Sequence, residues 1–250
     1  MLKTHHWVLL GVSVFLGLPM LWLALAYGGL PRLWSHHERK KMSSRTELVS
    51  YTAQDLPADP INLRLTGDEP FILCAFKRAG WSRSDDLSLS SGARIASTVL
   101  SHQPYPSAPV SPLYFQDRQQ DLAFELEEGA SAKKRHHVRL WHIDSRDWLA
   151  AASFDKGVGL SLYTLQITHH IGPDVDAERR RVGDLIIAAG GRAAGDLASG
   201  ITTAKRHRNG GGDHYTTNGS VLALTLSPLC AQLQDGPQSA GSALAKQAQS

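Results

Sequence analysis

Residues 136–154, HHVRLWHIDSRDWLAAASF, decide the fold. Two runs rich in apolar and aromatic residues, 136–142 and 148–154, flank the polar stretch DSRD at 144–147. Runs of this length joined by a short polar connection are typical of two antiparallel strands and the turn between them. The stretch therefore predicts a β-hairpin, and a hairpin of this kind belongs to an antiparallel sheet.

The segments on both sides of this hairpin add further strands and helices. Apolar runs predict more strands at 61–65, 113–115, 121–126, 165–171 and 221–226. We expect 113–115 and 121–126 to form a second hairpin around 117–120. Helical spacing and end signals predict helices after the turn at 67–70, at 93–101 and at 174–189. This order predicts an α+β fold with a largely antiparallel sheet and helices packed on one face.

An apolar segment precedes the predicted domain. From Trp7 to Leu30 the chain has no charged residue, and Pro19 is the only strong helix breaker. A helix of this length is long enough to cross the hydrocarbon core of a membrane, so we predict a short N-terminal tail at 1–6 and a transmembrane helix at 7–30. The alternative is a cleaved signal peptide, because Ala24-Leu25-Ala26 has the form of a cleavage site. The apolar segment is, however, longer than the usual core of a signal peptide.

Basic residues follow this segment at once. The stretch from Arg32 to Arg45 contains five Lys or Arg and a single acid, Glu38. Basic residues beside a span resist translocation, so we expect a bacterial inner-membrane protein whose soluble part faces the cytoplasm, with the periplasmic side as the alternative. On the cytoplasmic side we expect no disulfide between Cys74 and Cys230. The basic stretch and the segment from Trp7 to Leu30 are the expected contacts with membrane lipid.

The charge of the remaining chain excludes one class of partner. The whole sequence carries 26 Lys and Arg against 23 Asp and Glu, a formal net charge of +3. Six of the bases and one of the acids precede residue 46, which leaves 20 bases against 22 acids in the rest. Nucleic-acid binding depends on an excess of positive charge, so we expect no nucleic-acid partner.

Composition predicts the other boundaries. The stretch 31–58 is polar, lacks a sustained period and ends near the turn-prone PADP, so we predict a basic juxtamembrane linker there. The folded domain then covers 59–230, and a low-complexity, disordered tail covers 231–250. Within the domain, the glycine-rich stretch 206–218 is predicted to be a mobile loop.

Two pairs of adjacent histidines lie in predicted strands. Successive side chains of a strand point to opposite faces, so the members of each pair are in different surroundings. His136 and His169 share their faces with apolar residues, and His169 is predicted to be a core histidine. His137 shares its face with Arg139, and His170 falls on the polar face of its strand.

If these strands are neighbours, His137, Arg139 and His170 converge on one polar face. Imidazole binds transition metals and guanidinium binds phosphate or carboxylate, so this face is a candidate metal or anion pocket. Asp174 follows His170 closely and would complete a metal site with His137 and His170. The alternative for Asp174 is structural, because an acid at the start of a helix favourably opposes the helix dipole.

Several short blocks occur in order between residues 59 and 180. They are DPINL (59–63), PYP (104–106), PVSPLY (109–114), QDLAF (120–124), RHHVRLW (135–141), FDKGVGLS (154–161) and THHIGPDVDAER (168–179). Together these blocks resemble the LssY C-terminal domain family of bacteria. Gly172 stands where that family tends to have Asp, which removes a carboxylate beside the histidines.

The resemblance implies an appendage of bacterial membrane proteins, in relatives placed beside DedA-like or phosphatidic-acid-phosphatase-like membrane domains. It implies no particular activity, and the Pro-Ser-Gly-His motif of that phosphatase is missing from this sequence. The sequence also lacks Gly-x-Ser-x-Gly, His-Glu-x-x-His, phosphate-loop and Cys-x-x-Cys motifs.

Three functions remain open. The first is an accessory or ligand-binding module at the membrane surface, with an anionic or lipid-derived ligand and a membrane-protein partner. The second is a metal-dependent hydrolase or phosphoesterase, in which His137, His170 and Asp174 hold a divalent metal cofactor and Arg139 holds the anion. His170, His137 and Arg139 are its candidate catalytic residues. The third is a purely structural, partner-binding domain.

Overall fold

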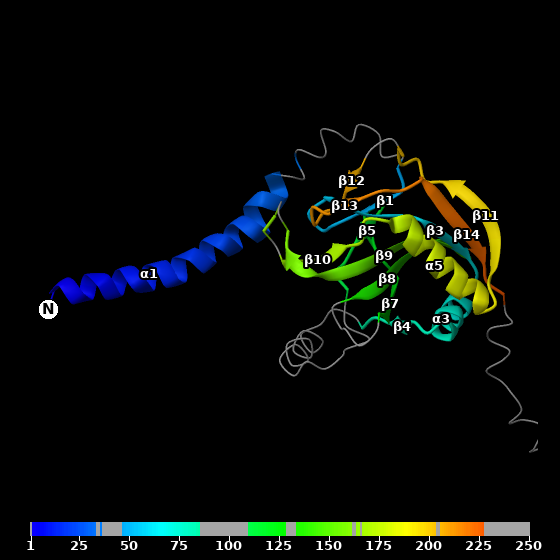
Figure 1. The fold of residues 1–250 in the computed structure, drawn as a ribbon, viewed down its shortest axis with the longest axis horizontal. Helices are drawn as coiled ribbons and strands as arrows, with labels where there is room; N and C mark the ends of the chain where they lie inside the picture. The colour runs from blue at the N-terminus through cyan, green and yellow to red at the C-terminus, as the bar shows by residue number, and fades with distance from the viewer. Residues whose placement is uncertain are drawn as a thin grey trace, which may run out of the picture.

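The computed structural model describes residues 2–33, 36, 47–85, 110–128, 134–161, 164–165, 167–203 and 206–227 (Figure 1). The predicted helix at 93–101 and the predicted tail at 231–250 lie outside these residues.

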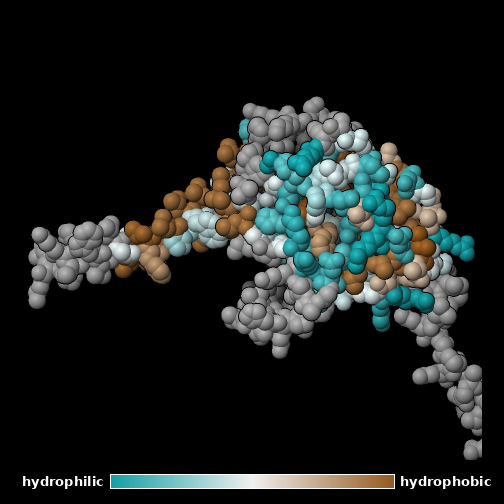
Figure 2. All heavy atoms as spheres, viewed as in Figure 1, coloured by the Kyte–Doolittle hydropathy of each residue, from teal (hydrophilic) through white to brown (hydrophobic). Residues whose placement is uncertain are grey.

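The N-terminal apolar segment is helical, as predicted. Helix α1 (Leu2–Ala24) passes through Pro19 and continues as a π-helical turn, η1 (Leu25–Gly29). The stretch Gly11–Leu33 has a mean hydropathy of 1.7 and is by length and composition able to cross a membrane. Figure 2 shows apolar side chains along this helix, outside the domain. A helix with so little of its apolar surface covered by protein is suited to lipid.

The domain is built on an eight-stranded sheet. Seven strands follow the order β11-β14-β3-β9-β8-β7-β4, and β10 pairs with the second half of β9. All pairs are antiparallel except β14 with β3. The strands are β3 (Leu63–Thr66), β4 (Ser82–Arg83), β7 (Leu122–Glu127), β8 (Arg135–Asp144), β9 (Asp147–Leu160), β10 (Ile167–Ile171), β11 (Arg192–Ala198) and β14 (Ser220–Thr225). The predicted α+β fold with a largely antiparallel sheet is confirmed.

Two helices cover one face of this sheet (Figure 1). They are α3 (Glu69–Arg78) and α5 (Val175–Ala188). Both helices share one buried apolar core with the strands, to which they contribute Ile72, Phe76, Val182 and Ile186. Burial of these apolar side chains is the main favourable contribution to the packing of helices on the sheet.

A smaller sheet packs on the opposite face. Its order is β2-β1-β5-β6, formed by β1 (Val49–Tyr51), β2 (Pro57–Pro60), β5 (Tyr114–Phe115) and β6 (Arg118–Gln119). Trp141 of β8 lies in a second buried core with Ala58 and Phe115 of the smaller sheet. Its Nε1 donates a hydrogen bond to the carbonyl oxygen of Arg118 at 3.1 Å. The main sheet is therefore covered on both faces.

Strands β1 and β2 correct the predicted boundary of the domain. Val49, Leu56 and Ala58 are buried, and β1 pairs with both β2 and β5. The prediction of a linker is therefore wrong for 47–58. These strands are three and four residues long, and β2 has proline at both ends, so they carry no alternating apolar signal. Pairing and burial in the tertiary structure stabilise them instead.

The predicted hairpin of 113–115 with 121–126 is wrong. Gln116 and Asp117 have positive φ angles of 50° and 62° and join β5 to β6 in a tight turn. Two successive residues with positive φ are characteristic of a two-residue hairpin connection. Strand β7 is thereby free to pair with β8. Gln-Asp is not a usual sequence for such a turn, which explains the error.

Other strands have no clear signal in the sequence. Strand β11 is exposed along its whole length and is held by its pairing with β14. The stretch predicted as a mobile loop at 206–218 contains the short strands β12 (His207–Arg208) and β13 (His214–Tyr215), which pair with each other. Short or exposed strands bury few side chains, so their sequences show no alternation.

Cys74 of helix α3 is buried and disulfide-bonded, which contradicts the expectation of no disulfide. Cys230 is the only other cysteine of the sequence. That expectation depended on a cytoplasmic location, because disulfides persist mainly in oxidising compartments.

Candidate functional site

The site lies on the central hairpin, which the structure confirms. The register of β8 with β9 places His137 opposite Ser153 and Arg139 opposite Ala151. Residues that pair across two strands share a face, and the face alternates along each strand. His137, Arg139, Ser153 and Asp155 therefore lie on the face of the sheet turned away from α3 and α5.

His136 lies on the opposite face and has a structural role. Its Nδ1 lies 2.9 Å and 3.0 Å from the two carboxylate oxygens of Glu178 in α5, and both side chains are buried. Its ring also packs against Trp81 and Phe154. These contacts tie β8 to α5 and explain a polar residue within the apolar core.

Three side chains from the adjacent strands β8, β9 and β10 meet on the face of the sheet turned away from α3 and α5. Nε2 of His137 lies 2.6 Å from Oδ2 of Asp155, and Nδ1 of His169 lies 2.9 Å from the same oxygen. One ligand atom from each residue lies within 4.8 Å of the other two. The side chains of His137 and Asp155 are 3% and 7% exposed, whereas that of His169 is 41% exposed. We call these three residues the His-Asp-His centre, which is buried but open at His169.

The pairing of β10 brings His169, not His170, to this centre. Strand β10 pairs with β9 from Ile167 to Ile171, and the register shifts between His170 and Ile171, where Asp155 is the partner. A bulge of this kind changes which side chains of the two strands share a face. The prediction of His169 as a core histidine is therefore wrong, and His169 was missed as a site residue.

The other predicted metal ligands lie elsewhere. Nδ1 of His170 lies 2.9 Å from Oδ1 of Asp213 in the segment between β12 and β13. Asp174 is the N-cap of α5, where its Oδ1 accepts a hydrogen bond from the backbone N–H of Ala177 at 2.9 Å. The structure does not bring His170 and Asp174 together with His137.

Arg139 is held by a buried acid from the smaller sheet. Its Nη1 donates a hydrogen bond to Oδ2 of Asp59 at 3.0 Å, and the hydroxyl of Ser153 donates to the same oxygen at 3.1 Å. Burial raises the pKa of Asp59 above its ordinary value, although Arg139 acts in the opposite direction. Because Asp59 pairs with the guanidinium through Nη1, an external anion would have to compete with this carboxylate, although Nε of Arg139 is buried without a hydrogen-bond partner among the described residues.

Glu125 of β7 lies behind His137. Its Oε1 is 3.6 Å from Nδ1 of His137, and its Oε2 accepts a hydrogen bond from Nη1 of Arg135 at 2.7 Å. Burial raises the pKa of Glu125, while His137 and Arg135 oppose that effect. The two ring nitrogens of His137 thus face two different carboxylates: Nδ1 faces Glu125, and Nε2 faces Asp155.

Asp155 carries the negative charge of the centre. Burial acts to raise its pKa, but the neighbouring His137 and His169 outweigh burial and hold the pKa of Asp155 well below its ordinary value. An acid with a lowered pKa is ionised at neutral pH. The centre therefore presents a buried carboxylate between two imidazoles.

The contacts within the centre are short but lack hydrogen-bond geometry. Within the described ranges, both ring nitrogens of His137 and Nδ1 of His169 are buried without a hydrogen-bond partner. Buried polar atoms in folded proteins nearly always have one. These ring nitrogens are therefore available to bind a ligand, because no described protein atom is hydrogen-bonded to them.

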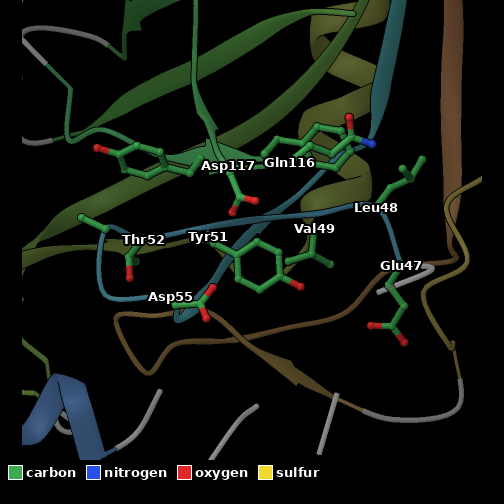
Figure 3. Close-up of a pocket in the computed structure, with 11 residues that line it drawn as sticks. Glu47, Leu48, Val49, Tyr51, Thr52, Asp55, Gln116 and Asp117 are labelled. Carbon is green, nitrogen blue, oxygen red and sulfur yellow. The ribbon is translucent and has the colours of Figure 1, made fainter. Parts of the chain in front are cut away.

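A separate cavity of about 600 Å³ lies at the smaller sheet and is lined by residues of β1, β5 and their adjoining turns. Figure 3 shows the ring of Tyr51 between the carboxylates of Glu47 and Asp55. Asp117 adds a third acid, and the described residues that line this cavity include no Lys, Arg or His. This lining disfavours a negatively charged ligand.

The fold and the site define a class of protein: an α+β domain with a buried polar centre, preceded by an apolar N-terminal helix. The family described as LssY C-terminus matches residues 40–221, nearly three quarters of the sequence, and the chain belongs to this family. The resemblance found in the sequence is thus confirmed. No curated protein and no solved structure matches the chain.

Proposed function

We propose that the chain is a membrane-anchored binding module whose LssY C-terminal domain binds a small cationic ligand at the His-Asp-His centre. The observation that carries this proposal is the buried carboxylate of Asp155, whose Oδ2 lies 2.6 Å from Nε2 of His137 and 2.9 Å from Nδ1 of His169, two nitrogens without hydrogen-bond geometry to any described residue. A buried charge is costly unless it is paired, so the centre favours a positively charged ligand. The exposed side of His169 gives that ligand a way in.

The charges oppose the anionic or lipid-derived ligand that the sequence led us to expect. Arg139 is engaged by Asp59, and the cavity of Figure 3 is lined by acids. A hydrolase that uses His137, His170 and Asp174 as metal ligands lacks support, because the three residues are not together. A purely structural role does not explain why the buried ring nitrogens of His137 make no hydrogen bond to any described residue. An accessory role beside a membrane-protein partner stays within the proposal, because the resemblance implies it.

The anchor in this proposal is the apolar helix. The helix continues past Ala24-Leu25-Ala26, and Arg32 donates a hydrogen bond to the carbonyl oxygen of Gly28 at 2.7 Å near its end. Nε1 of Trp22 donates a hydrogen bond to the carbonyl oxygen of Leu165, just before β10, at 3.2 Å. Because Trp22 lies near the middle of the stretch Gly11–Leu33, this contact cannot form while the stretch spans a membrane, so the proposed anchor rests on the length and composition of the helix.

Two features indicate opposite sides of the membrane. The basic stretch from Arg32 to Arg45 favours the cytoplasm, whereas the disulfide at Cys74 favours an oxidising compartment such as the periplasm. A reporter that is active only in the periplasm, fused after Ser250, decides between them. Activity of this reporter excludes the cytoplasmic orientation.

Cell fractionation tests the anchor. We expect the full chain, tagged at its C-terminus, to stay in the membrane fraction after carbonate washing and to have the mass of the uncleaved sequence. A soluble protein that begins after Ala26 would overturn the anchor and support a signal peptide.

Thermal unfolding of the full chain in detergent tests the ligand class. A ligand that binds the folded state alone raises Tm as its concentration exceeds Kd. We expect divalent cations or the polyamine spermidine to raise Tm, inorganic phosphate to have no effect, and His169→Ala to abolish the rise. Stabilisation by phosphate that survives His169→Ala would contradict a cation site.

A further inference from the structure

We infer that the His-Asp-His centre is a binding site for a divalent transition-metal ion such as Zn²⁺. This inference rests on the proposed function and names the chemical class of its cationic ligand. Two imidazole nitrogens and one carboxylate oxygen form the donor set, and this combination is typical of Zn²⁺ and related ions.

The spacing of the donor atoms supports a metal site. Ligand atoms around a tetrahedral ion, at bond lengths of about 2.0–2.2 Å, are about 3.3 Å apart. Oδ2 of Asp155 lies 2.6 Å from Nε2 of His137 and 2.9 Å from Nδ1 of His169. These two separations are shorter than the tetrahedral value by less than one ångström, and the two nitrogens lie within 4.8 Å of each other. The rings of the two histidines are nearly perpendicular, with an interplanar angle of 78°, so their nitrogens approach Asp155 from different directions.

The missing hydrogen bonds favour a metal over a simple histidine–aspartate network. In such a network an N–H of each ring points at the carboxylate, and here the short contacts lack that geometry. A metal ion instead accepts the lone pairs of both nitrogens and of the carboxylate. It would satisfy two buried nitrogens that have no hydrogen-bond partner among the described residues, Nε2 of His137 and Nδ1 of His169.

Glu125 completes the arrangement as a positioning residue. A histidine that binds a metal through one nitrogen commonly donates its other N–H to a carboxylate, which fixes the ring. Oε1 of Glu125 lies 3.6 Å from Nδ1 of His137, on the side away from Asp155, and is itself buried without a partner within the described part of the chain. Arg135 holds the other oxygen of Glu125 at 2.7 Å.

The exposure of His169 leaves part of the coordination sphere accessible. His137 and Asp155 are almost fully buried on the rigid strands β8 and β9, while His169 lies at the surface on β10. Three protein ligands with an open position are characteristic of sites that exchange a water or a ligand, whereas closed structural zinc sites have four. We therefore expect this centre to hold a metal ion that remains accessible from solution.

The test uses the full chain in detergent, stripped of metal by a chelator, incubated with Zn²⁺ or Mg²⁺ and then desalted. We expect about one Zn²⁺ to be retained per chain and Mg²⁺ to be lost, because imidazole donors prefer transition metals. Loss of a ligand costs more than loss of the neighbour that positions it. We therefore expect His169→Ala to lower Zn²⁺ affinity more than about 100-fold, and Glu125→Gln to lower it about tenfold.

His170→Ala is the matched control, because it removes the adjacent histidine that contacts Asp213 instead. It should leave Zn²⁺ affinity unchanged. Asp155→Asn keeps the shape of the side chain and should abolish binding, which separates loss of a ligand from loss of fold. Circular dichroism confirms that each variant is folded, and bound Co²⁺ should give a visible absorption that His169→Ala removes.

Two results would overturn the metal site: no retained Zn²⁺ in the wild-type chain, or retention that depends on His170 and not on His169. If spermidine still raises Tm in a manner that depends on Asp155, the proposed cation-binding function stands and the metal inference alone fails. If neither cation binds, both fail.

Discussion

Nη1 of Arg139 donates a hydrogen bond to Oδ2 of Asp59 at 3.0 Å, and this buried ion pair joins β8 of the main sheet to β2 of the smaller one. The hydroxyl of Ser153 donates to the same oxygen. The smaller sheet is therefore attached through a charged contact as well as through the apolar core around Trp141. The residue predicted to hold an anionic ligand holds part of the fold together instead.

Replacement of Asp59 by Ala should strongly destabilise the domain. The change leaves the guanidinium of Arg139 buried without its partner, at a cost of about 3–5 kcal/mol in the free energy of unfolding. The double variant Asp59→Leu with Arg139→Met removes both charges and should recover much of that loss. Unfolding by urea, followed by tryptophan fluorescence of the full chain in detergent, measures both values. A single variant as stable as the wild type would show that the pair contributes nothing.

The sequence predicted the elements with strong, local signals. The hairpin at 136–154 was predicted from two apolar runs around a polar turn, and α5 from Pro173 at its start and Gly190 at its end. Strands β1, β2 and β11 were missed, because pairing and tertiary burial stabilise them and their sequences show no alternation.

The candidate site was predicted only in part, because local strand alternation places some of its residues and tertiary strand pairing places the others. Strand alternation correctly placed His137 on the face opposite His136. Extending the predicted hairpin by one residue would have added Asp155, which shares the face of Ser153. The bulge between β9 and β10 decides that His169 joins the site in place of His170, and no local pattern marks that bulge.

Asn62 should be a second stability determinant, because its side chain substitutes for backbone pairing. Its Nδ2 donates to the carbonyl oxygen of Ala152 at 2.9 Å, and its Oδ1 accepts from the N–H of the same residue at 2.9 Å. Asn62→Ala leaves these buried groups unpaired and should lower the free energy of unfolding by about 2–4 kcal/mol. Gln54→Ala, in a turn of the smaller sheet, serves as the control. Equal urea midpoints for the two variants would contradict this role.

Asp147 should make the stability of the domain depend on pH. Its carboxylate accepts hydrogen bonds from Arg64 at 2.7 Å and Thr66 at 2.9 Å, and these bonds hold its pKa below the ordinary value. A lowered pKa contributes stability that is present above the unfolded pKa of about 3.9 and is lost as the pH falls through the folded value.

We therefore expect Asp147→Asn to cost about 1 kcal/mol or less near neutral pH, since the contact is partly exposed. The difference in Tm between this variant and the wild type should shrink below about pH 4. Asp184→Asn, on the exposed side of α5, controls for the loss of one charge. A difference that grew as the pH fell would have the wrong sign for this mechanism.

Gly159 should determine the position of His170. A Cβ at Gly159 would lie 2.6 Å from Nε2 and 2.9 Å from Cδ2 of the His170 ring. Gly159→Ala should therefore push this ring away from Asp213, whose Oδ2 also accepts a hydrogen bond from the N–H of Ile171 at 3.1 Å. We expect a loss of about 1–3 kcal/mol in the free energy of unfolding, as for other overpacking substitutions.

Gly157→Ala is the matched control on the same strand, because a Cβ there meets no atom within 4 Å. It should leave the urea midpoint unchanged or raise it slightly, since alanine is less flexible than glycine in the unfolded chain. Addition of His170→Ala to Gly159→Ala removes the clash, so the double variant should lose little beyond His170→Ala alone. If Gly159→Ala were instead as stable as Gly157→Ala, the ring of His170 would not be fixed over Gly159. Zn²⁺ retention should be the same in both glycine variants, because His170 lies outside the His-Asp-His centre.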